Sequence, residues 1–301
     1  MQTREAIEGF LLRYKPATQR SYGKALHRFE AYIGPECSVR TITEQDVGRW
    51  VQNMRTQNVK YANHPKRPAE YAPLSPWTVY RRIKTVKIFF NWLVKNGVLE
   101  RSPAAFLPNP RPTDTADGKA AHEDDVEALL AAARAAGVRD YAIVLLLARS
   151  GCRRADVSNL RLQDLELSAC RAYVWGKGDV RVVRYFDEET ARAIAAWLRV
   201  RPASETDRVF VTSKGRPLTP QAVYQVLKRR SRDAGLPHTI NPHSLRHAVG
   251  TRLHRAGFSL LEIQKYLGHR SWRTTTVYIS VAPERMREAA AKLGRERENR
   301  I

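Results

Sequence analysis

The stretch HSLRHAVGTRLHRAGFSLLEIQKYLGHRSWRTTTVYIS, His243 to Ser280, holds most of the information about fold and chemistry in this chain. Its apolar spacing predicts two helices, His243–Ala256 and Leu260–Leu267. A polar and basic segment follows, in which Tyr278 stands nine residues after His269. Taken alone, Tyr278 is typical of a half-buried packing residue, so other parts of the chain must indicate whether its hydroxyl reacts.

His243 and Arg246 stand three residues apart at the start of the first of these helices. Residues at this spacing share one helix face, here beside the positive end of the helix dipole. A guanidinium can fork onto two phosphate oxygens while an imidazole donates or accepts a proton, so the pair suits a phosphate. The plain alternative is two ordinary surface residues, which an isolated pair of this kind usually is.

Four histidines, His238, His243, His247 and His254, raise the alternative of a zinc site, because the middle pair has the i,i+4 spacing of helical zinc ligands. No glutamate follows the first histidine of that pair, and the cationic Arg246 lies between them. The chain also lacks the GxxxxGK[ST] loop of ATP-binding proteins. We therefore predict no metal and no other cofactor.

Two further basic residues occupy places where the chain changes direction. Arg153 follows a Ser-Gly pair in ARSGCRRADVSNL, Ala148 to Leu160, where a helix is predicted to break and restart. Lys177 lies between two glycines in WGKGDVR, at the tip of a predicted hairpin, where an exposed ammonium can reach a ligand oxygen. Each signal alone is weak, since solvated arginines and GKG turns are common.

The 301-residue chain carries 52 Lys and Arg against 30 Asp and Glu, a net charge of +22. Residues 1–110 contribute +10 and residues 111–301 contribute +12, so both halves are basic. Such an excess indicates a polyanionic partner. Double-stranded DNA fits better than a membrane, because no basic amphipathic anchor and no run of eighteen apolar residues occurs.

The expected compartment is the cytoplasm. Three unevenly spaced cysteines form no disulfide framework, and the opening MQTREAIEGFLLRY lacks the apolar core of a signal peptide.

Helical patterns fill the first hundred residues. Helices are predicted over Thr18–Ile33, from a capping pattern at Thr43, and from Ser75-Pro76 until Gly97. The polar stretch Gln57–Pro73 predicts a loop. SPAAFLPNPRPTDTADGKA, Ser102 to Ala120, holds four prolines and predicts a linker between two domains.

The second half predicts helices at Glu123–Ala136 and Tyr141–Ala148, and then a strand, a glycine turn and a strand in ACRAYVWGKGDVRVVRYF. Further helices are predicted at Glu188–Val200, at Pro220–Ala234, in the opening stretch and at Pro283–Leu293. The fold class is therefore mainly α: an N-terminal helical domain plus an α-rich domain with a small β-sheet.

The chain carries, in this order, an arginine after Ser-Gly, a lysine in GKG, the pair HxxR, the sequence LGH and then a tyrosine. In this order of motifs it resembles the tyrosine recombinases. This is the phage-integrase family, which includes the Xer chromosome-dimer resolvases. The resemblance implies a helical core-binding (SAM-like) domain at 1–105, a linker at 106–120 and a catalytic domain at 121–301. The sequence SGCR replaces the common TGLR, and DVRVVRYF lacks the usual lysine and the Val-Pro ending.

The resemblance also implies a role for each site residue. It places the two family arginines at Arg153 and Arg246, the hairpin lysine at Lys177, the paired histidine at His243, the LGH histidine at His269 and the nucleophile at Tyr278. Asp156 would be the acidic residue three after the first arginine, where glutamate is more usual. Tyr278 would form a covalent 3′-phosphotyrosine, with His243 as the base and Lys177 as the acid, without metal or ATP.

Recombination needs four strand cuts, so a tetramer on two DNA sites is expected, with a partner recombinase or accessory protein left open. The helix predicted at Pro283–Leu293 could pack on its own protomer or on a neighbour. Alternatives to recombination are a type IB-like topoisomerase or hairpin resolvase with the same chemistry, or a non-catalytic DNA-binding protein. In the N-terminal domain, the basic residues Arg81, Arg82, Lys84 and Lys87 are predicted to contact DNA.

Overall fold

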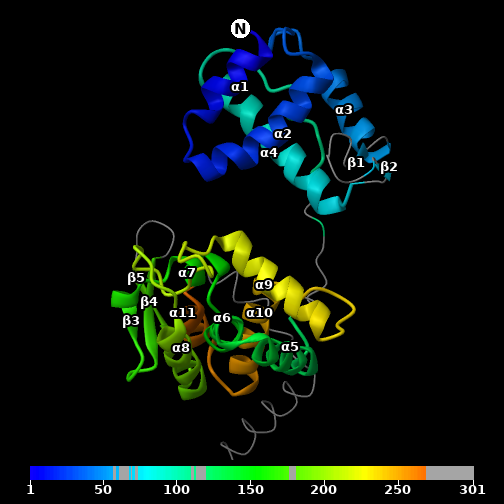
Figure 1. Ribbon diagram of the computed structural model, residues 1–301. Helices are drawn as coiled ribbons and strands as arrows, with labels where there is room; N and C mark the ends of the chain where they lie inside the picture. The colour runs from blue at the N-terminus through cyan, green and yellow to red at the C-terminus, as the bar shows by residue number, and fades with distance from the viewer. Residues whose placement is uncertain are drawn as a thin grey trace, which may run out of the picture. The chain divides into compact units, whose positions relative to one another are not determined.

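The structure is a computed structural model, which describes residues 1–56, 59–60, 68, 70–71, 74–109, 112, 120–175 and 181–268. The chain divides into two compact units, Met1–Asp114 and Thr115–Ile301, called here the N-terminal and C-terminal units (Figure 1). No helix in the described ranges has both the length and the apolar character that crossing a membrane requires. The roles assigned to the two domains and the linker remain predictions.

In the described part of the N-terminal unit there are four helices, and α4 contacts the other three (Figure 1). Aromatic side chains fill the space between them: the Phe29 ring lies 5.1 Å from Trp50 and 5.7 Å from Phe90, both edge to face. The elements are α1 Thr3–Leu11, α2 Pro16–Ile33, α3 Glu44–Thr56, β1 Val59–Lys60, β2 Glu70–Tyr71 and α4 Pro76–Lys95.

Local capping sets the starts of α3 and α4 where the sequence predicts them. The Asp46 carboxylate accepts the Thr43 N–H at 2.9 Å, and the Thr43 hydroxyl accepts the Asp46 N–H at 3.2 Å. The Ser75 hydroxyl accepts the Thr78 N–H at 3.3 Å, with Pro76 at the first helical position. The loop prediction for 57–73 is wrong in part, because β1 and β2 pair as a short antiparallel ladder.

The C-terminal unit is built around α6, whose residues Ala142–Ala148 are all buried. Helices α5, α8 and α10 pack on it (Figure 1). The helices are α5 Glu123–Ala136, α6 Val138–Ser150, α7 Arg154–Asn159, α8 Glu188–Val200, α9 Pro220–Asp233, α10 Pro242–Arg255 and α11 Leu260–Leu267, with a short 3-10 turn at Leu162–Asp164.

A small antiparallel sheet in the order β3-β4-β5 contacts α7 through β4 and α11 through β5. Its strands are β3 Leu165–Glu166, β4 Arg171–Trp175 and β5 Arg181–Tyr185, and the β4–β5 register ends with Trp175 opposite Arg181. The predicted fold class, mainly α with a small β-sheet, is confirmed, and β3 is a strand that the sequence did not indicate. The helix predicted at Pro283–Leu293 lies outside the described residues.

Candidate active site

The turn that carries Arg153 is formed by Ser150, Gly151 and Cys152 at the end of α6. The Ser150 hydroxyl donates to the Leu146 carbonyl at 2.5 Å and accepts the Cys152 N–H at 3.2 Å. Gly151 has φ +64°, in the left-handed region that favours glycine. A Cβ atom there would lie 2.7 Å from Leu267 Cδ2, so both backbone conformation and space require glycine.

Asp156 fixes the backbone of Arg153. Arg153 is extended and stands just before α7, and its N–H donates to Asp156 Oδ2 at 2.9 Å. A carboxylate in the first helical turn is favourable because free N–H groups and the positive dipole end lie there. Asp156 is buried, while Arg153 is partly exposed to solvent.

Asn241 caps α10 and so orients His243 and Arg246. Its Oδ1 accepts the N–H groups of His243 at 2.9 Å and Ser244 at 3.0 Å, and Pro242 occupies the first helical position. The helix therefore begins one residue before the predicted start. His243 and Arg246 lie one turn apart near its N-terminus, as their spacing predicts.

Arg246 is buried, with only 4% of its surface exposed, and joins three segments of the unit. Its Nη1 donates to the Gly151 carbonyl at 2.5 Å, and its Nη2 donates to the Leu267 carbonyl at the end of α11. The alternative of an ordinary solvated arginine therefore fails for Arg246. It ties the turn before Arg153 to the helix that leads into His269.

The charges around His243 favour its neutral form. Partial burial lowers the pKa of the imidazole below its usual 6.5, and the positive charges of Arg246, Arg153 and Arg154 lower it further. His243 nevertheless remains exposed to solvent. Arg153, His243 and Arg246, which come from two distant parts of the sequence, are thus close enough to influence one another.

The other predicted site residues, Lys177, His269 and Tyr278, lie outside the described residues. Their described neighbours are informative. Trp175 and Arg181, which flank the segment with Lys177, pair across β4 and β5, as the hairpin prediction requires. Gly268, which precedes His269, ends α11 in the left-handed conformation.

A residue that sequence reasoning missed is Arg184 in β5, whose Nη2 lies 3.6 Å from Asp156 Oδ2. Arg184 is 1% exposed. The strand offered no clear signal for this, because Val182 and Val183 are both apolar and do not show which face of β5 points inward.

The predicted DNA contacts on α4 differ in exposure. Arg81 and Lys84 are exposed and Arg82 is partly buried, whereas the Lys87 ammonium donates to the carbonyls of Ala105 at 3.2 Å and Leu107 at 2.8 Å. Lys87 therefore holds the segment after α4 within its own unit. Burial lowers the pKa of Arg82 to about 10, with a further contribution from the charge of Arg28.

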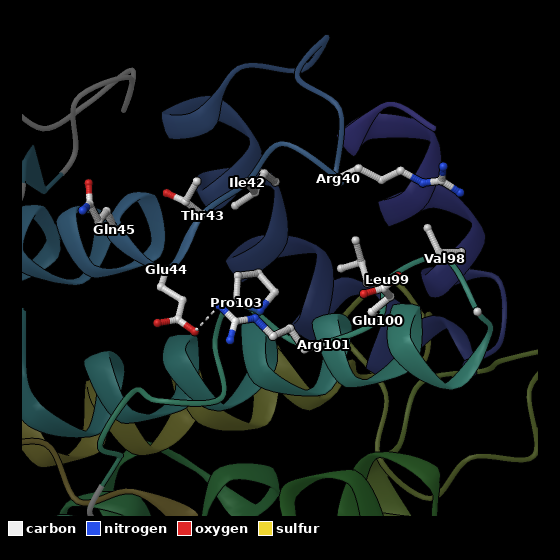
Figure 2. Close-up of a pocket in the computed structure, with 11 residues that line it drawn as sticks. Arg40, Ile42, Thr43, Glu44, Gln45, Val98, Leu99, Glu100, Arg101 and Pro103 are labelled. Carbon is white, nitrogen blue, oxygen red and sulfur yellow. Dashed lines mark ion pairs between the residues drawn. The ribbon is translucent and has the colours of Figure 1, made fainter.

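A surface cavity of about 1040 Å³ lies in the N-terminal unit, whereas Arg153, His243 and Arg246 belong to the C-terminal unit. Its lining includes Arg40, Arg101, Glu44 and Glu100, and Figure 2 shows Glu44 and Arg101 facing each other as an ion pair, at 3.6 Å. The two signs of charge balance along this groove, which does not suit a polyanion. Among the described residues, no group of three His, Cys, Asp or Glu side chains is placed to hold a metal ion.

The model of the phage integrase family matches residues 119–285. The chain is 34% identical over 220 residues to the tyrosine recombinase XerC of Corynebacterium glutamicum, covering 71% of each chain. It is 28% identical over 280 residues to the tyrosine recombinase XerD of Listeria innocua, covering 90% of each. The structure of the Tn1549 transposon integrase in complex with transposon right end DNA has a similar fold, with a TM-score of 0.75 at 18% identity over 98% of this chain and 99% of that one.

Proposed function

This chain belongs to the phage integrase family and is a tyrosine site-specific recombinase, and we propose that it cuts and rejoins DNA through Tyr278. The observation that carries this proposal is the convergence of Arg153, His243 and Arg246, which the family resemblance assigns to one active site. The matched residues 119–285 include Lys177, His269 and Tyr278.

In the proposed reaction, the Tyr278 hydroxyl oxygen attacks the phosphorus of a phosphodiester while His243 accepts the phenol proton. The bond from phosphorus to the 5′ oxygen breaks, and Lys177 gives that oxygen a proton. The product is a 3′-phosphotyrosine and a free 5′ hydroxyl. The reverse attack by a 5′ hydroxyl rejoins the strand and needs no nucleotide, because the phosphotyrosine keeps the energy of the broken bond.

The surroundings of His243 and Arg246 support these roles. A phenol with a pKa of about 10 is a weak nucleophile until a base or nearby cations activate it. The lowered pKa of His243 leaves its imidazole neutral near pH 7 and able to accept a proton. The carbonyl bonds of Arg246 hold its guanidinium in place before DNA binds, so Arg246 can stabilise the extra charge of the transition state with little reorganisation, and we propose that Arg153 and His269 add to this.

A nicked duplex that traps the cleaved strand tests the nucleophile. Tyr278→Phe removes one oxygen and should abolish the covalent protein–DNA adduct while DNA binding persists. Tyr224→Phe makes the same change on α9 and serves as the matched control. Normal adduct formation by Tyr278→Phe would end the proposal. Because we also propose that no metal takes part, EDTA should leave adduct formation unchanged, and rescue by zinc or magnesium after EDTA would contradict this.

Double-stranded DNA is the partner of this recombinase, and the net charge of +22 supports a large phosphate contact. We propose a tetramer on two recombination sites, because exchange between two duplexes requires four strand cuts. We also propose that the N-terminal unit contacts DNA, with the exposed Arg81 and Lys84 and the half-buried Arg82 as candidates. Whether a second recombinase or an accessory protein joins can be tested by reconstituting exchange with the purified chain alone.

A further inference from the structure

Arg184 occupies a position in β5 where the strand pattern calls for an apolar side chain. Within the β4–β5 ladder, Ala172 pairs with Arg184 and Val174 pairs with Val182, so these four residues share one face of the sheet. Ala172, Val174 and Arg184 are buried. An arginine therefore stands among apolar neighbours, and the small Ala172 opposite leaves space for it.

The Arg184 guanidinium bridges two segments that lead to predicted catalytic residues. Nη2 forms an ion pair with Asp156 Oδ2, the oxygen that accepts the Arg153 N–H. Nη1 donates to the Tyr266 carbonyl at 2.9 Å, two residues before Gly268. A Cβ atom on Gly268 would lie 3.2 Å from both Nη atoms, so the chain passes directly over the guanidinium just before His269.

Burying a charge is unfavourable unless partners compensate it, and here the compensation is incomplete. The ion pair with Asp156 is long at 3.6 Å, and Arg184 Nε is buried without a hydrogen-bond partner in the described part of the chain. An apolar residue would fill this face of the sheet at lower cost. The geometry of the two bridged segments gives a reason for an arginine here.

We propose that Arg184 is a positioning residue for DNA cleavage, which holds Asp156 and the end of α11 in one arrangement. Through Asp156 it fixes the turn of Arg153, and through the Tyr266 carbonyl it fixes the chain that enters His269. Arg246 also connects the turn before Arg153, through Gly151, with the end of α11, through Leu267, so both arginines hold these two segments together. This inference rests on the proposed function of Arg153 and His269.

The test compares full-length Arg184→Met and Arg184→Lys with the unaltered chain on the nicked duplex, in single turnover with saturating protein. Displacing a catalytic group by about 1 Å can cost about 100-fold in rate, so Arg184→Met should slow adduct formation by roughly that factor. Arg184→Lys keeps the charge but loses the planar guanidinium that bonds to both segments, so its rate of adduct formation should lie between those of Arg184→Met and the unaltered chain. DNA affinity should stay unchanged, because the buried Arg184 adds no exposed charge to the protein surface.

A merely structural role predicts a different outcome. Rates are therefore measured well below the melting temperature of each variant, where a structural defect alone would leave the rate of the folded protein unchanged. Arg171→Met is the matched control: it makes the same change on the neighbouring strand and breaks the ion pair with Glu166, at 2.6 Å, in a side chain that is 38% exposed. It should cleave at the rate of the unaltered chain.

Asp156→Asn provides a second test, and together with Arg184→Lys it decides the outcome if Arg184→Met does not fold. If Arg184 acts in part through Asp156, the double variant should be slowed by less than the product of the two single effects. Folded Arg184 variants that cleave at the normal rate, or single effects that multiply in the double variant, would overturn the inference. An unaltered chain that forms no adduct would instead overturn the proposed function, so the two failures are distinguishable.

Discussion

Gly151→Ala should destabilise the C-terminal unit more than the same change at a glycine of similar conformation in open surroundings. The left-handed conformation of Gly151 is one source of the loss, and the 2.7 Å approach of the new Cβ to Leu267 Cδ2 is the other. Leu267 is fully buried, so its methyl group can move only by displacing its neighbours. Gly235 at the end of α9 is the matched position, with φ +68° and nothing within 4 Å of the Cβ that alanine would add.

The two substitutions share their conformational terms. A left-handed alanine costs about 1–2 kcal/mol, and the lower entropy of the unfolded alanine chain offsets about 0.4–1 kcal/mol of this. Gly235→Ala should therefore lose about 1 kcal/mol in the free energy of unfolding. Gly151→Ala should lose a further amount of about 1–3 kcal/mol, the typical cost of forcing an extra methyl group into a packed core.

Calorimetry of the full chain measures the difference. For a unit of this size, 1 kcal/mol shifts the melting temperature by about 2–4 °C, so Gly151→Ala should melt at least a few degrees below Gly235→Ala. Adduct formation should also slow in Gly151→Ala alone, because Leu267 and Gly151 both carry carbonyls that hold Arg246. Equal melting temperatures for the two variants would show that the contact with Leu267 does not constrain this turn.

Three further results are expected. Arg153→Lys and Arg246→Lys should both slow adduct formation, because lysine lacks the planar guanidinium that donates two parallel hydrogen bonds. Only Arg246→Lys should also lower the melting temperature, since it loses two bonds to backbone carbonyls, and equal losses in the two variants would contradict this. At DNA concentrations far below saturation, the rate of adduct formation should fall on the acidic side with its half-maximal point below pH 6.5, because the pKa of His243 is lowered, and a half-maximal point above pH 6.5 would argue against His243 as the base. Arg81→Ala should weaken DNA binding and reduce the slope of log affinity against log salt by about 1, whereas Lys87→Ala should mainly lower the melting temperature of the N-terminal unit.

Most helices could be predicted from the sequence because their ends carry local signals. Glu188–Val200 begins after Asp187, whose carboxylate accepts the Thr190 N–H at 2.9 Å. Leu260–Leu267 begins after Ser259, where Glu262 accepts the Ser259 N–H at 2.7 Å. These bonds join residues three apart, so the sequence alone specifies them.

The missed features depend on contacts between distant residues. Strand β3 has two residues, too few for any periodicity, and it exists through pairing with β4. The burial of Arg184 depends on Asp156, and that of Arg246 depends on the carbonyls of Gly151 and Leu267. A local pattern cannot distinguish such arginines from solvated ones, because their partners lie elsewhere in the chain.

The charges near His243 also imply that DNA changes its basicity. In the free protein, Arg153, Arg154 and Arg246 oppose a proton on His243 and lower its pKa. A scissile phosphate bound among these groups brings a negative charge that offsets this repulsion, so the pKa of His243 should rise in the complex. The rate at DNA concentrations far below saturation reports the pKa of the free protein, and the rate at saturating DNA reports the pKa of the complex. The acidic decline should therefore lie at higher pH with saturating DNA, and coincident declines would show that the bound phosphate does not act on His243.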